Sequence, residues 1–273
     1  MTKQSQALVN GATRLIGIVG DPVAQVRSPE FYNPRLAQIG ANVVLVPLHV
    51  PTDRFETMMP ALLQLRNLTG LVVTIPFKER AAAFADEILP AALQVGAINA
   101  MRRNPDGRWS ADMFDGAGLV RALQDMGAPP AGKNILLLGA GGAGRAIAMA
   151  LARAGARALT LCELNDAKLT RLAADIARFF PDCAVVTAKA VTAAGHDIVI
   201  NATPVGMAPG DGLPTPLGPL DPACTVFDIV PKPDITPLMA YAAKAGCRVG
   251  GGQLMVNSQV DAVLDFLGFR PKA

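Results

Sequence analysis

The segment Asn134-Ile-Leu-Leu-Leu-Gly139-Ala-Gly-Gly-Ala-Gly144 decides how the second half of this chain folds. Its apolar run is short enough for a buried strand, three glycines at G-x-G-x-x-G spacing follow, and an Ala-rich stretch of high helix propensity comes next. Strand, glycine turn and helix in this order are typical of a dinucleotide site, where backbone N–H groups at the helix N-terminus bind phosphates. The residues predicted to contact a nicotinamide cofactor are Gly139, Gly141, Gly142, Ala143 and Gly144.

Glu163 lies where such a fold places the residue that chooses between the two nicotinamide cofactors. It follows the apolar run Ala158–Cys162 and comes 19 residues after Gly144. A carboxylate there accepts hydrogen bonds from the adenosine ribose hydroxyls and would repel the 2′-phosphate of NADP. We therefore expect Glu163 to bind cofactor, with NAD preferred and NADP as the second choice. The alternatives are a solvated strand end for Glu163 and an ordinary Gly-rich turn for the motif.

Composition argues against several other classes of function. The chain has 273 residues, 51% of them hydrophobic, which is enough for a large core. A net charge of +3 with 17% charged residues leads us to expect no nucleic-acid partner and no membrane binding. Two histidines and four scattered cysteines without a CxxC pair predict no metal site. The unpaired cysteines, and the lack of an apolar signal segment in residues 1–12, predict a cytoplasmic protein.

Alternating strand and helix patterns predict an α/β fold made of two units. In the first unit we expect strands at Arg14–Val19, Asn42–Val46 and Leu71–Thr74, and a hairpin of Ala97–Arg103 with Arg108–Ala111. Its predicted helices are Ser28–Ile39, with Ser28 as N-cap, and Asp53–Leu65. The segments Pro76–Ala85 and Pro90–Gly96 are each expected to contain a short helix.

The second unit follows a helix at Gly116–Met126 and a Pro/Gly-rich linker at 127–132. Its predicted strands are Asn134–Leu138, Ala158–Cys162, Cys183–Thr187, Asp197–Asn201, Thr225–Ile229 and Arg248–Val249, and its helices are Gly142–Ala154, Asp166–Phe179 and Thr236–Ala245. This alternation predicts a doubly wound parallel sheet of the Rossmann type. A last apolar helix, Gln253–Leu267, could cap either unit.

Six motifs in order resemble the shikimate/quinate dehydrogenase family, and the resemblance covers essentially the whole chain. They are Gly20-Asp-Pro-Val-Ala-Gln-Val-Arg-Ser28-Pro29, Val73-Thr-Ile-Pro-Phe-Lys78-Glu79, Gly96-Ala-Ile-Asn99, Asp112-Met-Phe-Asp115-Gly116, Asn201-Ala-Thr-Pro-Val-Gly-Met207 and Met255 to Gln259. The resemblance implies a substrate domain of residues 1–114 and 253–273, and a dinucleotide domain of residues 115–252. It also implies an active site in the cleft between them, and a last helix that returns to the first domain.

The resemblance further implies reversible NAD(P)-dependent oxidation of a ring hydroxyl of shikimate, quinate or a related cyclic polyol acid, as in aromatic amino acid biosynthesis. Lys78 would be the general base that removes the hydroxyl proton, and Asp115 its carboxylate partner. As plain sequence, Lys78 could instead be a solvated lysine and Asp115 a helix N-cap. The matched substrate-binding positions are Ser28, Thr74, Asn99 and Gln259, and those beside the nicotinamide are Thr203, Met207, Ile229 and Gly252.

Departures from the family pattern concern the substrate carboxylate. The family holds it with two serines and a tyrosine, but this chain has Val26 and Pro231 at two of those three positions. Arg27 could compensate, or could be a solvated surface residue. Met113 and Phe114 replace a polar pair. We therefore expect the family's chemistry on a substrate other than shikimate, or on shikimate with poorer turnover. The alternative is a catalytically weak or inactive family member that serves as an NAD-binding sensor or regulatory module. A monomer and a homodimer both remain open.

Overall fold

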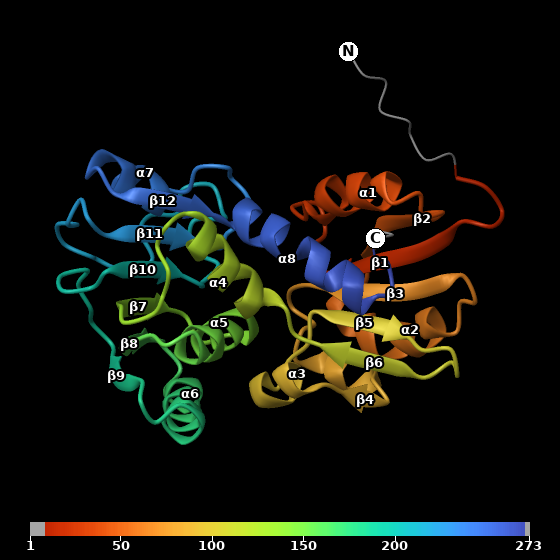
Figure 1. The fold of residues 1–273 in the computed structure, drawn as a ribbon, viewed down its shortest axis with the longest axis horizontal. Coiled ribbons are helices and arrows are strands. Elements are labelled where there is room, and N and C mark those ends of the chain that lie inside the picture. The colour runs from red at the N-terminus through yellow and green to blue at the C-terminus, as the bar shows by residue number, and fades with distance from the viewer. Residues whose placement is uncertain (1–8, 271–273) are drawn as a thin grey trace, which may run out of the picture. The chain divides into compact units, whose positions relative to one another are not determined.

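The computed structural model describes residues 9–270, which divide into two compact units (Figure 1). Unit 1 contains the described residues up to Phe114 together with those from Gln259 onward, and unit 2 is Asp115–Ser258. The α/β class predicted from the sequence is confirmed. The sequence predicts no secretory signal in residues 1–12, and residues 1–8 of that segment lie outside the described range.

Unit 1 is built on a mixed six-stranded sheet in the order β2-β1-β3-β5-β6-β4. Its strands are β1 (Arg14–Gly20), β2 (Val43–His49), β3 (Leu68–Val73), β4 (Glu87–Ile88), β5 (Ala100–Arg103) and β6 (Trp109–Asp112). Strands β2 and β3 pair in parallel with β1, and β5 runs antiparallel to both β3 and β6. The predicted hairpin is therefore confirmed. The two-residue strand β4 carries too short a pattern to be found from sequence.

Short helices connect these strands, and the N-cap of the first one differs from the prediction. They are α1 (Ser28–Gln38), η1 (Thr52–Arg54), α2 (Phe55–Leu63), η2 (Arg80–Phe84) and α3 (Pro90–Val95). The expected N-cap was wrong by one residue, because Arg27 occupies the cap position without a side-chain hydrogen bond. The short helix expected within Pro76–Ala85 is η2, which begins at Arg80, after a tight turn in which the Phe77 N–H donates to the Thr74 carbonyl.

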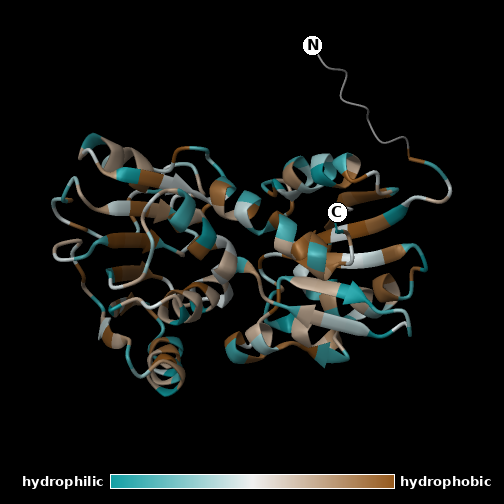
Figure 2. Cartoon of the chain, viewed as in Figure 1, coloured by the Kyte–Doolittle hydropathy of each residue, from teal (hydrophilic) through white to brown (hydrophobic). Residues whose placement is uncertain are grey.

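Unit 2 contains six parallel strands in the order β12-β11-β10-β7-β8-β9, which is the Rossmann arrangement. The strands are β7 (Asn134–Leu138), β8 (Ala158–Cys162), β9 (Ala184–Ala188), β10 (Ile198–Asn201), β11 (Thr225–Asp228) and β12 (Arg248–Gly251). The helices are α4 (Asp115–Asp125), α5 (Gly142–Arg153), α6 (Asp166–Phe179), α7 (Pro237–Lys244) and α8 (Gly252–Phe266). The central strands β7 and β10 are coloured mostly as hydrophobic in Figure 2 and are buried, as parallel strands covered on both faces must be.

Helix α8 belongs to both units. It begins in unit 2 at Gly252, and from Gln259 its residues pack in unit 1. There Leu267 fits against Gly70, and Arg102 donates a hydrogen bond of 3.2 Å to the Phe266 carbonyl and lies over the Phe266 ring. The sequence left open which unit this helix caps, and the structure divides it. Within residues 9–270 no helix is long and apolar enough to cross a membrane.

Candidate active-site residues in the two units

The proposed base, Lys78, stands in the turn between β3 and η2 in unit 1. The preceding residue, Phe77, is fully buried and stacks on Phe55 with ring centroids 3.9 Å apart. The Lys78 carbonyl accepts a hydrogen bond of 2.8 Å from the Ile98 N–H, and its side chain is half-buried. The backbone of this lysine is therefore held in place while its side chain stays within reach of solvent.

Asn99 and Gln259 meet inside unit 1, although they lie 160 positions apart. The Asn99 Nδ2 donates to the Gln259 Oε1 over 3.2 Å, and both side chains are buried. The Asn99 Oδ1 accepts from the Phe114 N–H at 2.9 Å, and the Asn99 carbonyl receives the Val73 N–H at the end of β3. Thr74 follows directly on β3 and Gln259 is joined to Asn99, so three of the four predicted substrate-binding residues are linked at the end of that strand.

The loop after β1 carries the fourth, Ser28, together with the departures from the family pattern. Ser28 is buried as the first residue of α1, and Val26 is half-buried. The Arg27 guanidinium binds the Glu30 carboxylate, with 2.8 Å from Nε to Oε2. Arg27 is thus held by a carboxylate of its own helix, which weakens the idea that it compensates for the missing serine.

The glycine motif of unit 2 forms the turn that a dinucleotide site requires. Gly139 has a φ of +96°, which favours glycine, and a Cβ at Gly144 would lie 2.2 Å from the Gly139 carbonyl oxygen. By contrast, a Cβ on Gly141 would meet nothing within 4 Å. Packing within the protein therefore demands glycine at 139 and 144. At 141 the open space suits a phosphate group approaching the N-terminus of α5.

Glu163 reaches back to this turn from the end of β8. Its Oε2 accepts the Ala140 N–H at 2.7 Å and its Oε1 accepts the Asn165 N–H at 2.9 Å. Partial burial raises the pKa of Glu163, but hydrogen bonds from the backbone N–H groups of Asn165, Ala140 and Leu164 outweigh it, and the pKa lies below its ordinary value. The side chain is therefore an anion at neutral pH, placed next to the glycine motif.

Residues predicted to flank the nicotinamide gather around Asn201, at the end of β10. The Asn201 Oδ1 accepts hydrogen bonds from the Thr203 N–H and hydroxyl, and the Asn201 carbonyl accepts the Ile229 N–H. Gly252 packs so closely that a Cβ there would lie 2.5 Å from the Ile229 carbonyl oxygen. Met207 lies on the loop that follows Thr203. The structure thus brings Thr203, Ile229 and Gly252 together.

A buried carboxylate below this cluster was missed in the sequence. Asp228, fully buried at the end of β11, accepts hydrogen bonds from Asn201 Nδ2 (3.0 Å), Val230 N (3.1 Å) and Thr236 Oγ1 (2.6 Å). Burial raises the pKa of this carboxyl group even though all three hydrogen bonds lower it. The signal in the sequence that could have identified Asp228 is an aspartate at the end of an apolar strand.

The remaining predicted residues are placed as follows. Asp115 is buried and is the first residue of α4, and Gly116 beside it packs against the Ala146 carbonyl of α5. Pro231 is half-buried on the loop after β11. Within residues 9–270 no group of three His, Cys, Asp or Glu side chains could hold a metal ion.

Comparison with known proteins gives the family. The family model described as "Shikimate dehydrogenase substrate binding domain" matches residues 18–101. The shikimate dehydrogenase (NADP(+)) of Rubrobacter xylanophilus is 35% identical over 271 residues, which cover 96% of this chain and 94% of that protein.

Two solved structures extend the likeness to the whole fold. A shikimate dehydrogenase in complex with NADP+ has a TM-score of 0.87 at 29% identity, covering 97% of this chain and 93% of the other. The quinate dehydrogenase of Corynebacterium glutamicum in complex with NAD has a TM-score of 0.81 at 27% identity and covers 95% of each chain. The chain therefore belongs to the shikimate dehydrogenase family and is an NAD(P)-dependent oxidoreductase that acts on CH–OH donors.

Proposed function

We propose that this enzyme reversibly oxidises a ring hydroxyl of shikimate, quinate or a related cyclic polyol acid. The observation that carries the proposal is the buried Asn99–Gln259 pair. It joins two residues expected to bind ring hydroxyls, in the same unit as Lys78. An amide pair offers both donors and acceptors, which hydroxyl groups need.

In the proposed mechanism Lys78 moves the proton. Its neutral amine takes the proton of the substrate hydroxyl while the hydride leaves the same carbon, and its ammonium returns that proton in the reverse direction. When bound, the nicotinamide cofactor supplies the hydride acceptor. Asp115 is the carboxylate that the family resemblance assigns as the partner of Lys78. Thr74, Asn99 and Gln259 orient the ring, and Ser28 contributes one hydroxyl toward the substrate carboxylate.

We further infer that NAD is preferred over NADP. The support is the Glu163 carboxylate, held ionised beside the glycine motif, and the neighbouring Leu164, whose side chain offers no cation to a 2′-phosphate. The Rubrobacter xylanophilus relative carries NADP(+) in its name. The proposal is thus that this chain differs from that relative in its preferred cofactor.

A substrate screen tests the proposed reaction. NAD reduction is measured with shikimate and quinate, for the native chain and for Lys78→Ala. We expect turnover with at least one acid, and a loss of about 10²- to 10⁴-fold in kcat for the variant, the usual contribution of a general base. Unchanged cofactor affinity would show that the variant is folded. Full activity of Lys78→Ala would refute the assignment of the base.

The same screen tests the substrate-carboxylate site. Val26→Ser restores one hydroxyl donor, and a hydrogen bond to a charged group contributes roughly 1.5–3 kcal/mol, so kcat/KM for shikimate should rise by about tenfold or more. Val26→Ala is the matched control, because it removes the branched side chain without adding a hydroxyl. If Val26→Ser left kcat/KM for shikimate at its native value, that result would contradict the expectation that the native chain lacks a needed hydroxyl donor to the substrate carboxylate.

A further inference from the structure

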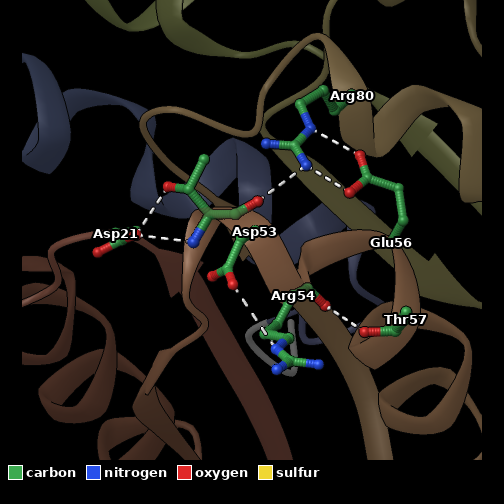
Figure 3. A network of polar contacts seen from close by, with 7 residues as sticks. Asp21, Asp53, Arg54, Glu56, Thr57 and Arg80 are labelled. Carbon is green, nitrogen blue, oxygen red and sulfur yellow. Dashed lines mark hydrogen bonds and ion pairs between the residues drawn. The ribbon is translucent and has the colours of Figure 1, made fainter.

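Arg80, two residues after Lys78, is the centre of a polar network in unit 1 (Figure 3). Its Nε donates to Glu56 Oε1 at 2.7 Å, and its Nη2 binds both Glu56 Oε2 and, at 3.0 Å, the Thr52 carbonyl. Glu56 lies at the start of α2 and Thr52 in η1. One guanidinium therefore ties the lysine segment to two neighbouring elements.

The same guanidinium lies over an aromatic stack. Its Cζ is 5.0 Å from the ring centroid of Phe55 and 5.4 Å from that of Phe77, the residue before Lys78. Glu56 holds the guanidinium from the side, and this hydrogen bond keeps the pKa of Glu56 below its ordinary value. Residues 77 and 80, on either side of Lys78, are thus both fastened to the first turn of α2.

A second carboxylate closes the network. Asp21, in the loop that leads toward Ser28, accepts hydrogen bonds from the Thr52 N–H (2.8 Å) and hydroxyl (2.7 Å). The Asp21 N–H also donates to the Ile75 carbonyl, only three residues before Lys78. Three links therefore close a ring. Asp21 binds Thr52, Thr52 binds Arg80, and Ile75, in the segment before Lys78, binds Asp21.

We propose that Arg80 is a positioning residue, which fixes the Lys78 segment against α2 and against the loop containing Asp21. This rests on the proposed role of Lys78 as base. An arginine suits the place because its planar fork binds a carboxylate in two positions while its face stacks on rings, which a lysine ammonium cannot do. A small displacement of a proton-transfer group costs much of the rate, so Arg80 acts on kcat through Lys78.

The test compares Arg80→Met, Arg80→Lys and Glu56→Gln. We expect Arg80→Met to lower kcat by about ten- to a hundredfold, since it loses both hydrogen-bonding arms. Arg80→Lys should recover part of that loss, and Glu56→Gln should fall between native and Arg80→Met. KM for NAD should not change, because the cofactor residues lie in unit 2. The matched control is Arg54→Met, an exposed arginine in the same view that contacts Asp53, and it should keep the native kcat.

A double-mutant cycle separates positioning of Lys78 from general damage to the fold. In a Lys78→Ala background, adding Arg80→Met should leave the residual rate unchanged, because the group that Arg80 positions is already gone. A further fall of the residual rate, or a native kcat for Arg80→Met alone, would overturn the proposal. If instead Lys78→Ala itself keeps the native kcat, Lys78 is not the base. This outcome refutes the proposed function and differs from the two outcomes that overturn the positioning role of Arg80.

Discussion

A single carboxylate, Glu163, is the residue on which the proposed preference for NAD rests. Its two oxygens are bound by backbone N–H groups of the glycine motif and of its own turn, so it has one orientation. Leu164 beside it is 88% exposed. The Lys189 ammonium near this turn binds the Leu164 carbonyl and Asp166, at 2.7 Å and 2.6 Å. The Lys189 ammonium is therefore engaged by the protein's own acceptors.

Cofactor preference should reverse when Glu163 and Leu164 in this turn are substituted. We expect the native enzyme to favour NAD in kcat/KM by roughly tenfold or more, the factor that 1.4 kcal/mol of repulsion gives. The double variant Glu163→Asn with Leu164→Arg removes the anion and adds a phosphate-binding cation, so it should favour NADP. Steady-state kinetics with both cofactors measure this ratio.

The control for that experiment is Asp182→Asn, which removes an equal charge from an exposed site in the same unit. It should leave the ratio of kcat/KM values unchanged, because Asp182 precedes β9 and so lies at the amino edge of the parallel sheet, opposite the turn after β8. A native enzyme that turns over NADP better than NAD would contradict the role given to Glu163.

Individual site residues could be predicted only where a motif marks them. The glycine motif, Glu163, Lys78 and Asn99 all stand in recognisable strings, and the contact of Asn99 with Gln259 agrees with their common role. Arg80 and Glu56 were missed, since they lie 24 positions apart and neither has a periodic or motif signal. Only the fold brings such pairs together, so the sequence could not show that Arg80 binds anything.

Among the elements, β10 and β11 end together in the Asn201–Asp228–Thr236 cluster. The cluster holds the turn after β10 through Thr203, and it holds the start of the loop after β11 through Val230. Parallel strands end at one edge of their sheet, which is where ligands of such sheets bind. The buried carboxylate therefore shapes two of the loops proposed to contact the cofactor.

Asp228→Asn should reveal this carboxylate in the pH dependence of stability. Burial raises the folded-state pKa of Asp228 above its ordinary 3.8, so the native state binds this proton more tightly than the unfolded state. The free energy of unfolding then falls as pH rises from about 3.8 through the folded-state pKa. The native chain's advantage over Asp228→Asn, measured by urea unfolding, should thus be larger at mildly acid pH than at pH 7.

Asp197→Asn is the control of opposite sign. A hydrogen bond from the Asn134 N–H lowers the pKa of Asp197 below 3.8, so its contribution is complete above that value and is lost only as pH falls further. Between mildly acid and neutral pH, this variant should differ from the native chain by a constant amount. Equal pH dependence of the two variants would contradict the raised pKa of Asp228.

Elements with strong patterns were predicted closely, and those set by tertiary contacts were not. The bounds of β7, β8 and α6 agree with the predictions to the residue, because each combines an apolar pattern with a clear start signal, such as the Asn165 cap of α6. The sequence placed η2 only within the segment Pro76–Ala85 and gave no start residue, since the turn at Phe77 depends on burial of its ring against Phe55.

At the scale of the whole molecule, the chain crosses between its two units twice. It passes from unit 1 to unit 2 at Asp115 and returns along α8 at Gln259, so the end of the chain completes the core of unit 1. Leu267 is 7% exposed and fills the space beside Gly70, where even a Cβ would lie 2.7 Å from its Cδ2. Composition and periodicity could show that this helix is apolar, but not which core needs it.

Leu267→Ala should therefore destabilise unit 1 alone. Removing a buried leucine side chain costs about 2–5 kcal/mol, depending on how far the site collapses.

Trp109, the single tryptophan of the chain, is buried on β6 and reports on unit 1 by its fluorescence. We expect the free energy of unfolding obtained from the Trp109 fluorescence transition in urea to fall by that amount, while the affinity for NAD, which we propose binds unit 2, stays native. Leu172→Ala, a fully buried change on α6, is the matched control, and it should shift far-ultraviolet circular dichroism without moving the Trp109 transition. If both variants moved both signals equally, the two units would unfold in one cooperative transition. That outcome would contradict the expectation that Leu267→Ala destabilises unit 1 alone.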